Sequence, residues 1–456
     1  MVTASRRSAV LGPDGQSFEV ALLDQEIATA TRWGWRDARH DTVASGLTPE
    51  RLGAVMREAA QGQARAYLTL AMEIEERYLH YASQLQVRRL ALDAIEPSVV
   101  APKGVPARIV DAVHALVDDP EFRNLPADLM DGVAKGYSVV ELIWDYRGGL
   151  LRPTAYKHRD PRFFQFDQVG LTDLRLIPET GPVGFEGEGE PLAAGKFVQH
   201  MPRIRTGIPI RRGLARSAAW AFIVQSFALQ DWSAFAEVYG IPFRVGRYGP
   251  NASDADKRTL LRAVRNIAND GAAIMPIGME LEFFSVQGNH GEAVFGNLIG
   301  YIDRQVSKVV LGQTMTSDDG ASLGQAKVHN EVRLDIRQAD CRGVVGTINR
   351  DVIRWFVAVN FGPQEVYPAV HMLAAEPEDV KALTEGLSKL VPLGLRVDQR
   401  EVRRKMGLSE PAPDAELLAP AAAARPGRTR PAGLGTGRLA ACDPYLPEGD
   451  DWELVH

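Results

Sequence analysis

An unusually long apolar pattern runs through the middle of the chain, from Leu214 to Tyr239. The stretch contains no Gly or Pro, and its only charged residues are Arg216, Asp231 and Glu237. The pattern predicts a long α-helix over 214–240 that is apolar on several faces. Such a helix suits the core of a large domain or packing against other subunits, and the pattern alone leaves both open.

Two further long helices are predicted downstream. The first covers about 291–311, where seven apolar residues recur at helical spacing: Phe295, Leu298, Ile299, Ile302, Val306, Val309 and Val310. The Gly-containing segment "GQTMTSDDGASLG" ends it. A third helix is then predicted from about Gln325 to Phe361, with Gly343 and Gly346 tolerated inside it.

A compact strand–helix–strand module is predicted between the first two of these helices, at 241–290. "FRVGRYG" and "AAIMPIGMELEFFSV" have the composition of strands. Between them "SDADKRTLLRAVRNIAN" predicts a helix, because Ser253 and Asp256 have the spacing of a capping box.

The first 213 residues predict an α+β region. Residues 1–44 are expected to be loosely ordered, with Trp33 and Trp35 as anchors. Thr48 as N-cap and Pro49 at the first helical position start a helix. "ARAYLTLAMEIEERYLHYASQLQVRRLALDAI" predicts one longer helix that Pro97 closes.

A helix in "LPADLMDGVAKG" is expected to end at Gly136. After Gly136 the pattern predicts β-strands. A hairpin is expected to turn at Gly148–Gly149, and "LTDLRLIP" and "KFVQHMPR" are predicted as further strands. Near the C-terminus, "VDQREVRRKMGL" predicts a short helix with Asp398 and Glu401 as its capping box. The Ala/Pro/Gly-rich residues 411–456 are expected to be disordered.

Composition narrows the class of protein. At 456 residues the chain has room for two or three domains, and a net charge of −6 argues against a protein that grips phosphates. Two cysteines, Cys341 and Cys442, exclude a disulfide framework and fit a reducing compartment. The N-terminus lacks the apolar core of a signal peptide, and no stretch has about 18 uncharged apolar residues. We therefore expect no membrane partner.

The sequence lacks the common catalytic and nucleotide-binding motifs. The Gly–Lys pair in "AAGKFVQH" is followed by Phe and has no phosphate loop before it. The glycines at 433, 435 and 437 follow no strand. His158, Arg159 and Asp160 are expected to form a strand-to-turn junction, because Pro161 forces an extended residue before it.

One helical segment holds residue types that bind metals: His329, Glu331, Asp335 and Asp340. Arg333 and Arg337 lie among them, so the favoured interpretation is a solvated face with i,i+4 ion pairs. Cys341 has no matched histidine and is expected to be a small buried residue. We therefore predict no catalytic residues, no metal, no cofactor and no enzymatic activity.

An ordered series of segments resembles the phage portal (head–tail connector) proteins of the Mu-like prophage type. The segments are "YLTLAMEIEERYLHYASQLQVRRLAL", "GYSVVELIW", "HRDPRFFQFD", "RGLARSAAWAFIVQSFALQDWSAFAEVYGIPFRVGRYG", "AAIMPIGMELEF", "QVSKVVLGQTMTSDDG" and "VHNEVRLDI". The resemblance covers about residues 45–410. It implies a phage portal fold, α+β, with wing, helical stem, clip and crown regions.

The resemblance also implies how the chain is divided. Residues 45–213 would form the wing, 214–240 and 291–311 the two stem helices, and 241–290 the clip between them. Residues 312–324 would be the tunnel loop, and 325–410 the closing wing and crown segments. The arm at 1–44 and the tail at 411–456 lie outside the resemblance.

Site residues follow from this division. Stem packing between subunits is expected at Trp220, Phe222, Phe227, Leu229 and Trp232, which point in different directions around the helix. The tunnel loop facing DNA would comprise Gln313, Thr314, Met315, Thr316, Ser317 and Asp318, and deleting these six should spare assembly. The clip helix carries a basic cluster: Lys257, Arg258, Arg262 and Arg265. That cluster fits contact with an acidic partner or DNA, and a plain solvated face equally well.

The function implied is a ring, of twelve subunits in the virion, at one capsid vertex. Double-stranded DNA would pass through it in packaging and ejection without sequence specificity. The implied partners are other copies of the chain, the terminase large subunit, capsid and scaffold proteins, and neck and tail adaptors, with assembly in the host bacterial cytoplasm. Another ring-forming head–tail adaptor or minor capsid component is the alternative, and a metal-dependent nuclease or hydrolase a third interpretation.

Overall fold

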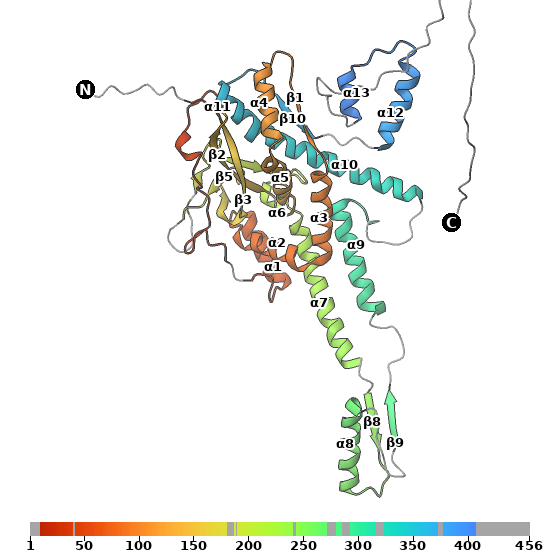
Figure 1. Cartoon of the computed structure of the whole chain (residues 1–456). Helices are drawn as coiled ribbons and strands as arrows, with labels where there is room; N and C mark the ends of the chain where they lie inside the picture. Colours follow the sequence, from red (N-terminus) through yellow and green to blue (C-terminus); the bar gives the residue numbers. More distant parts are fainter. Residues whose placement is uncertain are drawn as a thin grey trace, which may run out of the picture. The chain divides into compact units, whose positions relative to one another are not determined.

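The chain forms two compact units, Met1–Ala374 and Ala375–His456, in a computed structural model (Figure 1). The structure describes residues 10–39, 42–179, 187, 189–239, 243–270, 280–284, 292–314, 323–372 and 377–406. The predicted tail at 411–456 therefore lies outside the described residues.

Three helices open the first unit: α1 (Pro49–Ala60), α2 (Arg65–Arg77) and α3 (Leu79–Asp93). The predicted start of α1 is confirmed, because the Thr48 hydroxyl accepts a hydrogen bond from Arg51 N at 3.3 Å and Pro49 follows it. Leu52, Leu68 and Ile74 on these helices are completely buried. They form one side of the hydrophobic core.

The prediction of a single helix from 64 to 95 is wrong. Tyr78 has φ −94° and ψ 88°, which interrupts the helical backbone between α2 and α3. Its ring is buried, and its hydroxyl donates to Asp303 Oδ1 at 3.0 Å. This contact is made with a segment 225 residues away, so the break reflects tertiary packing and not a local Gly or Pro signal.

The next helices are α4 (Ala107–Val117), α5 (Pro120–Leu129) and α6 (Asp131–Lys135). They precede an antiparallel sheet in the order β3–β2–β7, formed by β2 (Ser138–Arg147), β3 (Leu150–Arg159) and β7 (Phe197–His200). The predicted hairpin is confirmed, since Gly148 and Gly149 have φ of 62° and 80° between β2 and β3.

Two smaller sheets complete the β-structure of this region. One contains β4 (Phe164–Phe166), β5 (Leu174–Leu176) and β6 (Glu190–Pro191). The other pairs β1 (Pro97–Val100) with β10 (Ala369–Met372), antiparallel. Pro97 therefore starts a strand that pairs with the last strand of the first unit.

Gly136 ends α6 in the left-handed region, as predicted, with φ 109°. We expect Gly136→Ala to lower the free energy of unfolding by at least about 2 kcal/mol, because the backbone strain costs about 1–2 kcal/mol and a steric overlap adds to it. A Cβ there would lie 2.5 Å from the carbonyl oxygen of Pro209. Thermal and denaturant unfolding measure the change.

The matched control is Gly148→Ala, which has φ 62° and open space around the added methyl group. It should cost only the strain, about 1–2 kcal/mol. Equal losses in the two variants would show that the contact of residue 136 with Pro209 does not constrain the fold.

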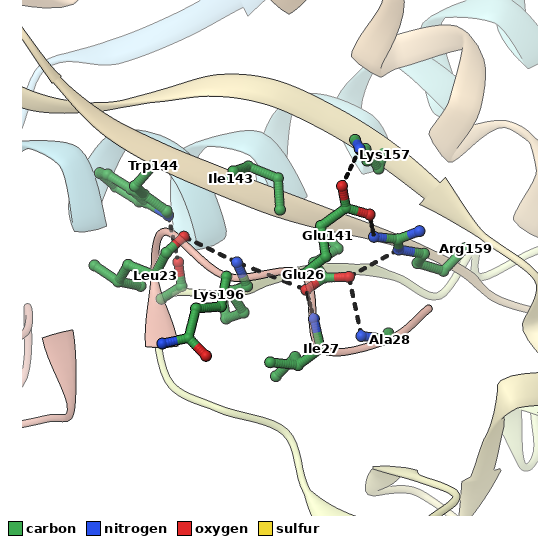
Figure 2. Close-up of polar contacts among 12 residues, drawn as sticks. Leu23, Glu26, Ile27, Ala28, Glu141, Ile143, Trp144, Lys157, Arg159 and Lys196 are labelled. Carbon is green, nitrogen blue, oxygen red and sulfur yellow. Dashed lines mark hydrogen bonds and ion pairs between the residues drawn. The ribbon is translucent and has the colours of Figure 1, made fainter. Parts of the chain in front are cut away.

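The N-terminal arm is more closely packed than the sequence predicts. Leu23 and Ala28 are buried, whereas Trp33, a predicted anchor, is 74% exposed. Figure 2 shows the polar contacts that hold the arm. The Glu141 carboxylate on β2 accepts from the backbone N–H groups of Ile27, at 2.7 Å, and Ala28, at 3.2 Å.

Two cations balance this buried carboxylate. Arg159 Nε donates to Glu141 Oε2 at 2.8 Å, and Lys196 Nζ lies 3.6 Å from Oε1. Glu141 and Lys196 are both completely buried, and Lys196 also donates to the carbonyl oxygen of Leu23 at 2.9 Å. Buried charged residues outside the arm thus hold it in place, and the pattern of apolar residues in the arm did not predict them.

The long helix α7 (Ala215–Tyr239) is followed by β8 (Phe243–Arg247), α8 (Asp254–Asp270) and β9 (Glu280–Phe284). β8 and β9 are antiparallel. The predicted capping box of α8 is confirmed: Ser253 N donates to Asp256 Oδ2 at 3.0 Å, and Asp256 N donates to Ser253 Oγ at 3.3 Å. A π-helical turn, η4 (Glu292–Gly296), leads into α9 (Asn297–Leu311).

The third predicted long helix is α10 (Leu323–Ile348) and α11 (Arg354–Phe361), joined by a π-helical turn, η5 (Asn349–Ile353). The second unit contains α12 (Pro377–Leu390) and α13 (Gln399–Lys405). The predicted closing wing and crown segments at 325–410 are divided between the two units, because α10 and α11 belong to the first. Among the described residues, no helix is long and apolar enough to cross a membrane.

Candidate functional site

The two predicted stem helices, α7 and α9, pack against each other and against other helices of the first unit (Figure 1). α7 contacts α1 and α2, and its Ala215, Ala218 and Ile223 are buried. α9 contacts α3 and buries Ile302, Val306 and Val310. One face of each helix is therefore fixed within the subunit.

The remaining surface of α7 carries an apolar stripe that the described part of the chain covers only in part. Trp220 is 48% exposed, Val224 44% and Phe227 45%. Side chains three and four residues apart are neighbours on a helix, so these three form a continuous strip. We call Trp220, Val224 and Phe227 the α7 stripe.

The other predicted packing residues lie elsewhere on α7. Leu229, also half exposed, is two residues beyond Phe227 and points to roughly the opposite side. Phe222 is half-buried, with its ring 6.4 Å from that of Tyr78, so part of its surface packs inside the subunit. Trp232 is half-buried.

Exposed apolar residues on α9 extend the candidate surface: Leu298, Tyr301 and Val309. Together with Val224 they are absent from the packing residues predicted from the sequence. Their helical spacing identifies them as apolar positions, but spacing cannot tell which face the subunit itself covers.

Polar contacts hold α9 against α3. His80 Nε2 lies 2.7 Å from Ser307 Oγ, close to the Tyr78–Asp303 hydrogen bond. Arg88 on α3 donates to the Val310 carbonyl at 2.9 Å and forms a two-pronged ion pair with Asp340 of α10, at 2.6 and 2.8 Å. Both side chains of this pair are buried, so the prediction of a solvated face is wrong at Asp340.

The predicted tunnel loop begins with a sharp turn at Gly312, which has φ 71°. A Cβ there would lie 2.7 Å from Val332 Cγ1 and 3.0 Å from Ile336 Cδ1, so the turn lies directly against α10. Gln313 is only 4% exposed and not on an open loop as predicted, because the turn brings the chain back onto that helix. Thr314 is half-buried, and Met315, Thr316, Ser317 and Asp318 lie outside the described residues.

Two members of the predicted basic cluster of the clip already make contacts within the clip itself. Lys257 Nζ donates to Asp254 Oδ1 at 3.2 Å and lies 5.4 Å from the centre of the Tyr248 ring. Arg258 Nε donates to the Asp254 carbonyl at 3.1 Å, and Arg262 is exposed. The side chain of Arg265 lies outside the described residues.

The other residues weighed for chemistry have structural roles. Asp160 accepts a hydrogen bond from Arg162 N at 2.9 Å and caps a short turn, which confirms the predicted junction. His158 Nε2 lies 3.3 Å from Asp131 Oδ2. Cys341 is buried, as predicted, and burial raises the pKa of its thiol to about 11. Within the described residues, no group of three or more His, Cys, Asp or Glu side chains could hold a metal ion.

Comparisons with known proteins agree with this architecture. Residues 68–408 match the family described as portal protein of Mu bacteriophage. The Mu-like prophage FluMu protein gp29 of Haemophilus influenzae (strain Rd) is 34% identical over 391 residues, which cover 83% of this chain and 74% of that protein. The portal protein of Escherichia phage Mu is 32% identical over 420 residues, or 89% of this chain and 79% of that protein.

Solved structures are more distant. The neck of a native gene transfer agent particle, computed with C12 symmetry, shares 12% identity and a TM-score of 0.46, covering 72% of this chain and 89% of that one. An HK97-family phage portal protein from Corynebacterium diphtheriae also shares 12% identity, with a TM-score of 0.35, over 67% and 93% of the two chains.

The matches in sequence define the class, which is that of phage portal proteins. The chain belongs to the family of the Mu bacteriophage portal protein. The resemblance and the α+β portal fold predicted from the sequence are thereby confirmed. Portal proteins form a ring at one vertex of the capsid, are part of the virion, and are structural proteins.

Proposed function

We propose that twelve copies of this chain form a ring through which double-stranded DNA is packaged and ejected, without catalysis by the ring itself. The observation that carries the proposal is the partly exposed α7 stripe, together with exposed apolar residues on α9, the helix that packs against α7. Apolar residues aligned on two paired helices need a partner surface, and in a cyclic ring the adjacent subunit supplies it. The stripe and Leu229 face different sides, which suits a helix with a neighbour on each side.

The regions act as stem, clip and wing in this proposal. α7 and α9 form the stem, the module of β8, α8 and β9 forms the clip, and Arg258 and Arg262 on α8 contact an acidic surface of the terminase large subunit or of a neck adaptor. Capsid and scaffold proteins contact the wing. Assembly takes place in the host bacterial cytoplasm before the ring enters the virion.

The tunnel loop at 312–324 faces DNA in this proposal. Gln313 is buried and Gly312 is fixed against α10, so the test spares both. Replacing Met315 to Asp318 with Gly–Ser residues of equal length is expected to leave ring assembly unchanged and to reduce DNA packaging at least about tenfold. The reduction is expected because a channel loop acts on DNA that moves past it. Packaged DNA per capsid, measured by nuclease protection, gives the result.

The control replaces Ala101 and Lys103, two exposed residues outside the stem, with Ser. Normal packaging by the loop variant would remove the loop from the proposal. Loss of the ring itself would instead show that the loop is part of the assembly interface.

A further inference from the structure

The charges of this chain are strongly segregated along its sequence. No Asp or Glu occurs between Glu190 and Asp231, whereas that interval holds six cations: Lys196, Arg203, Arg205, Arg211, Arg212 and Arg216. The whole chain has a net charge of −6, so the residues outside the interval carry −12 together. Five of the six cations are arginines that immediately precede or begin α7, and we call these five the arginine patch.

The arginine patch is not neutralised by carboxylates in the described part of the chain. Arg205 donates to Ser217 Oγ at 2.6 Å, Arg212 to the Gly207 carbonyl at 2.8 Å, and Arg216 to the Met56 carbonyl at 3.0 Å. All three acceptors are neutral.

The guanidinium groups of Arg203 and Arg211 are exposed, and neither has a hydrogen-bond or ion-pair partner among the described residues. None of the five positive charges is therefore paired with a carboxylate among the described residues.

The pKa values of the two half-buried members are lowered, mainly by burial and further by neighbouring arginines. Burial lowers the pKa of Arg212, and the charge of Arg203 lowers it further. Burial also lowers the pKa of Arg216, against a raising effect of Tyr67, and the charges of Arg211 and Arg205 add to the lowering. Like charges held this close destabilise the isolated chain, and an anionic partner would remove that cost.

Arg203 and Arg212 also line a groove of about 1170 Å³ that lies between this segment and α10. Two acids of the groove are already engaged: Asp340 pairs with Arg88, and Asp351 pairs with Arg350 at 2.6 Å. A third, Asp173, is exposed on the lining.

The α10 side of the groove leaves room for a polypeptide. Gly343 and Gly346 present no side chain there, and a Cβ added at Gly346 would meet nothing within 4 Å. His200 lies deeper, 2.9 Å from Thr347 Oγ1, where burial, followed by the charge of Arg350, lowers its pKa to about 4. The imidazole is therefore neutral at pH 7, and the arginines remain the charged groups of the groove.

We propose that the arginine patch and its groove bind a carboxylate-bearing segment of the adjacent copy of this chain, an inference that rests on the proposed ring. In a head-to-tail ring, two different surfaces of the same chain meet at every interface. In such a ring the basic region at 191–230 of one copy can meet an acidic surface of the next copy, so the two surfaces attract each other. DNA is the less suitable partner, because arginine–phosphate contacts add affinity to a molecule that has to slide.

The first test reverses two charges of the patch, in the variant Arg203→Glu/Arg211→Glu. The matched control is Lys103→Glu/Arg123→Glu, which changes the net charge equally at two exposed residues away from the patch. Light scattering over a range of protein concentrations gives the midpoint of assembly. We expect the patch variant to raise that midpoint at least about tenfold over the control, with a smaller difference at high salt.

Three results separate this inference from the proposed function. If the unmodified chain never forms rings, the ring proposal fails first. If it forms rings and both variants assemble alike, the ring stands and the role of the patch is refuted. If the patch variant assembles normally but loses binding to double-stranded DNA at low salt, the phosphate backbone is the partner and the inference is overturned.

A second experiment identifies the partner carboxylates. The variant Arg203→Lys/Arg211→Lys keeps both charges and supplies amines for zero-length carbodiimide cross-linking to Asp and Glu. Rings assembled from mixed isotope-labelled and unlabelled chains should yield cross-links that join the two labels. Cross-links confined to single chains would contradict the proposal.

Discussion

Replacing Trp220 and Phe227 together with aspartate is expected to produce a folded chain that no longer assembles into rings. Both side chains are nearly half exposed in the single chain, so their replacement removes little of its core. In the ring each would be buried against the next subunit, which is worth about 1.5–3 kcal/mol for a large apolar side chain. Two buried aspartates add a desolvation cost, so we expect the midpoint of assembly to rise at least about 100-fold, or about 2.7 kcal/mol.

The control is the variant Val169→Asp/Tyr146→Asp, which makes the same chemical change at two exposed apolar residues outside the stem. It should assemble like the unmodified chain. Circular dichroism and thermal unfolding establish that both variants are folded. If the Trp220/Phe227 variant assembles with the same midpoint concentration as the unmodified chain, the α7 stripe is not an intersubunit surface.

Glu141→Gln is expected to lower the free energy of unfolding of the first unit by about 3–5 kcal/mol, the usual cost of removing one partner from a buried ion pair. The substitution leaves the completely buried cation of Lys196 without the Glu141 anion, and Arg159 keeps only its ion pair with the partly exposed Glu26. It also weakens the acceptor that holds the backbone of Ile27 and Ala28. The arm should therefore become the first site of limited proteolysis, before global unfolding.

Glu26→Gln provides the matched control, because Glu26 also pairs with Arg159 but is partly exposed. Surface pairs contribute about 0–1 kcal/mol, so this variant should unfold almost like the unmodified chain. Denaturant titrations at pH 7 compare the two. A similar, small loss for both variants would contradict the role of Glu141 in holding the arm.

Local signals along the sequence predicted the elements whose causes are local. The Thr48–Pro49 start, the Gly136 end, the Gly148–Gly149 hairpin and the Ser253–Asp256 capping box all depend on residues within a few positions. The long helix α7 was also predicted, because an unbroken apolar run without Gly or Pro has few alternatives.

Features fixed by distant contacts were missed. Tyr78 interrupts a sequence of good helix formers because its hydroxyl meets Asp303. Arg88 and Asp340 are 252 residues apart, so no pattern within either helix shows that both are buried. The pairing of β1 with β10 joins the two ends of the first unit and has no local signal either.

The family resemblance predicted the functional regions, but the roles of individual residues within them were predicted less well. Helical spacing marks Trp220 and Phe227 as apolar, but only the packed structure shows that they share a partly exposed face with Val224. Gln313 was misplaced because the turn at Gly312 returns the chain to α10. The acid-free interval from 191 to 230 was visible in the sequence, but its meaning depends on the absence of local carboxylate partners in the described structure.

The mass and shape of the purified assembly test the central claim most directly. Light scattering combined with negative-stain electron microscopy should show closed rings with a central hole and a mass of about 600 kDa, twelve times 49.9 kDa. A ring of this kind would place α7 between subunits. A monomer of 49.9 kDa at every concentration tested, in the presence of capsid and scaffold proteins as well, would contradict the claim.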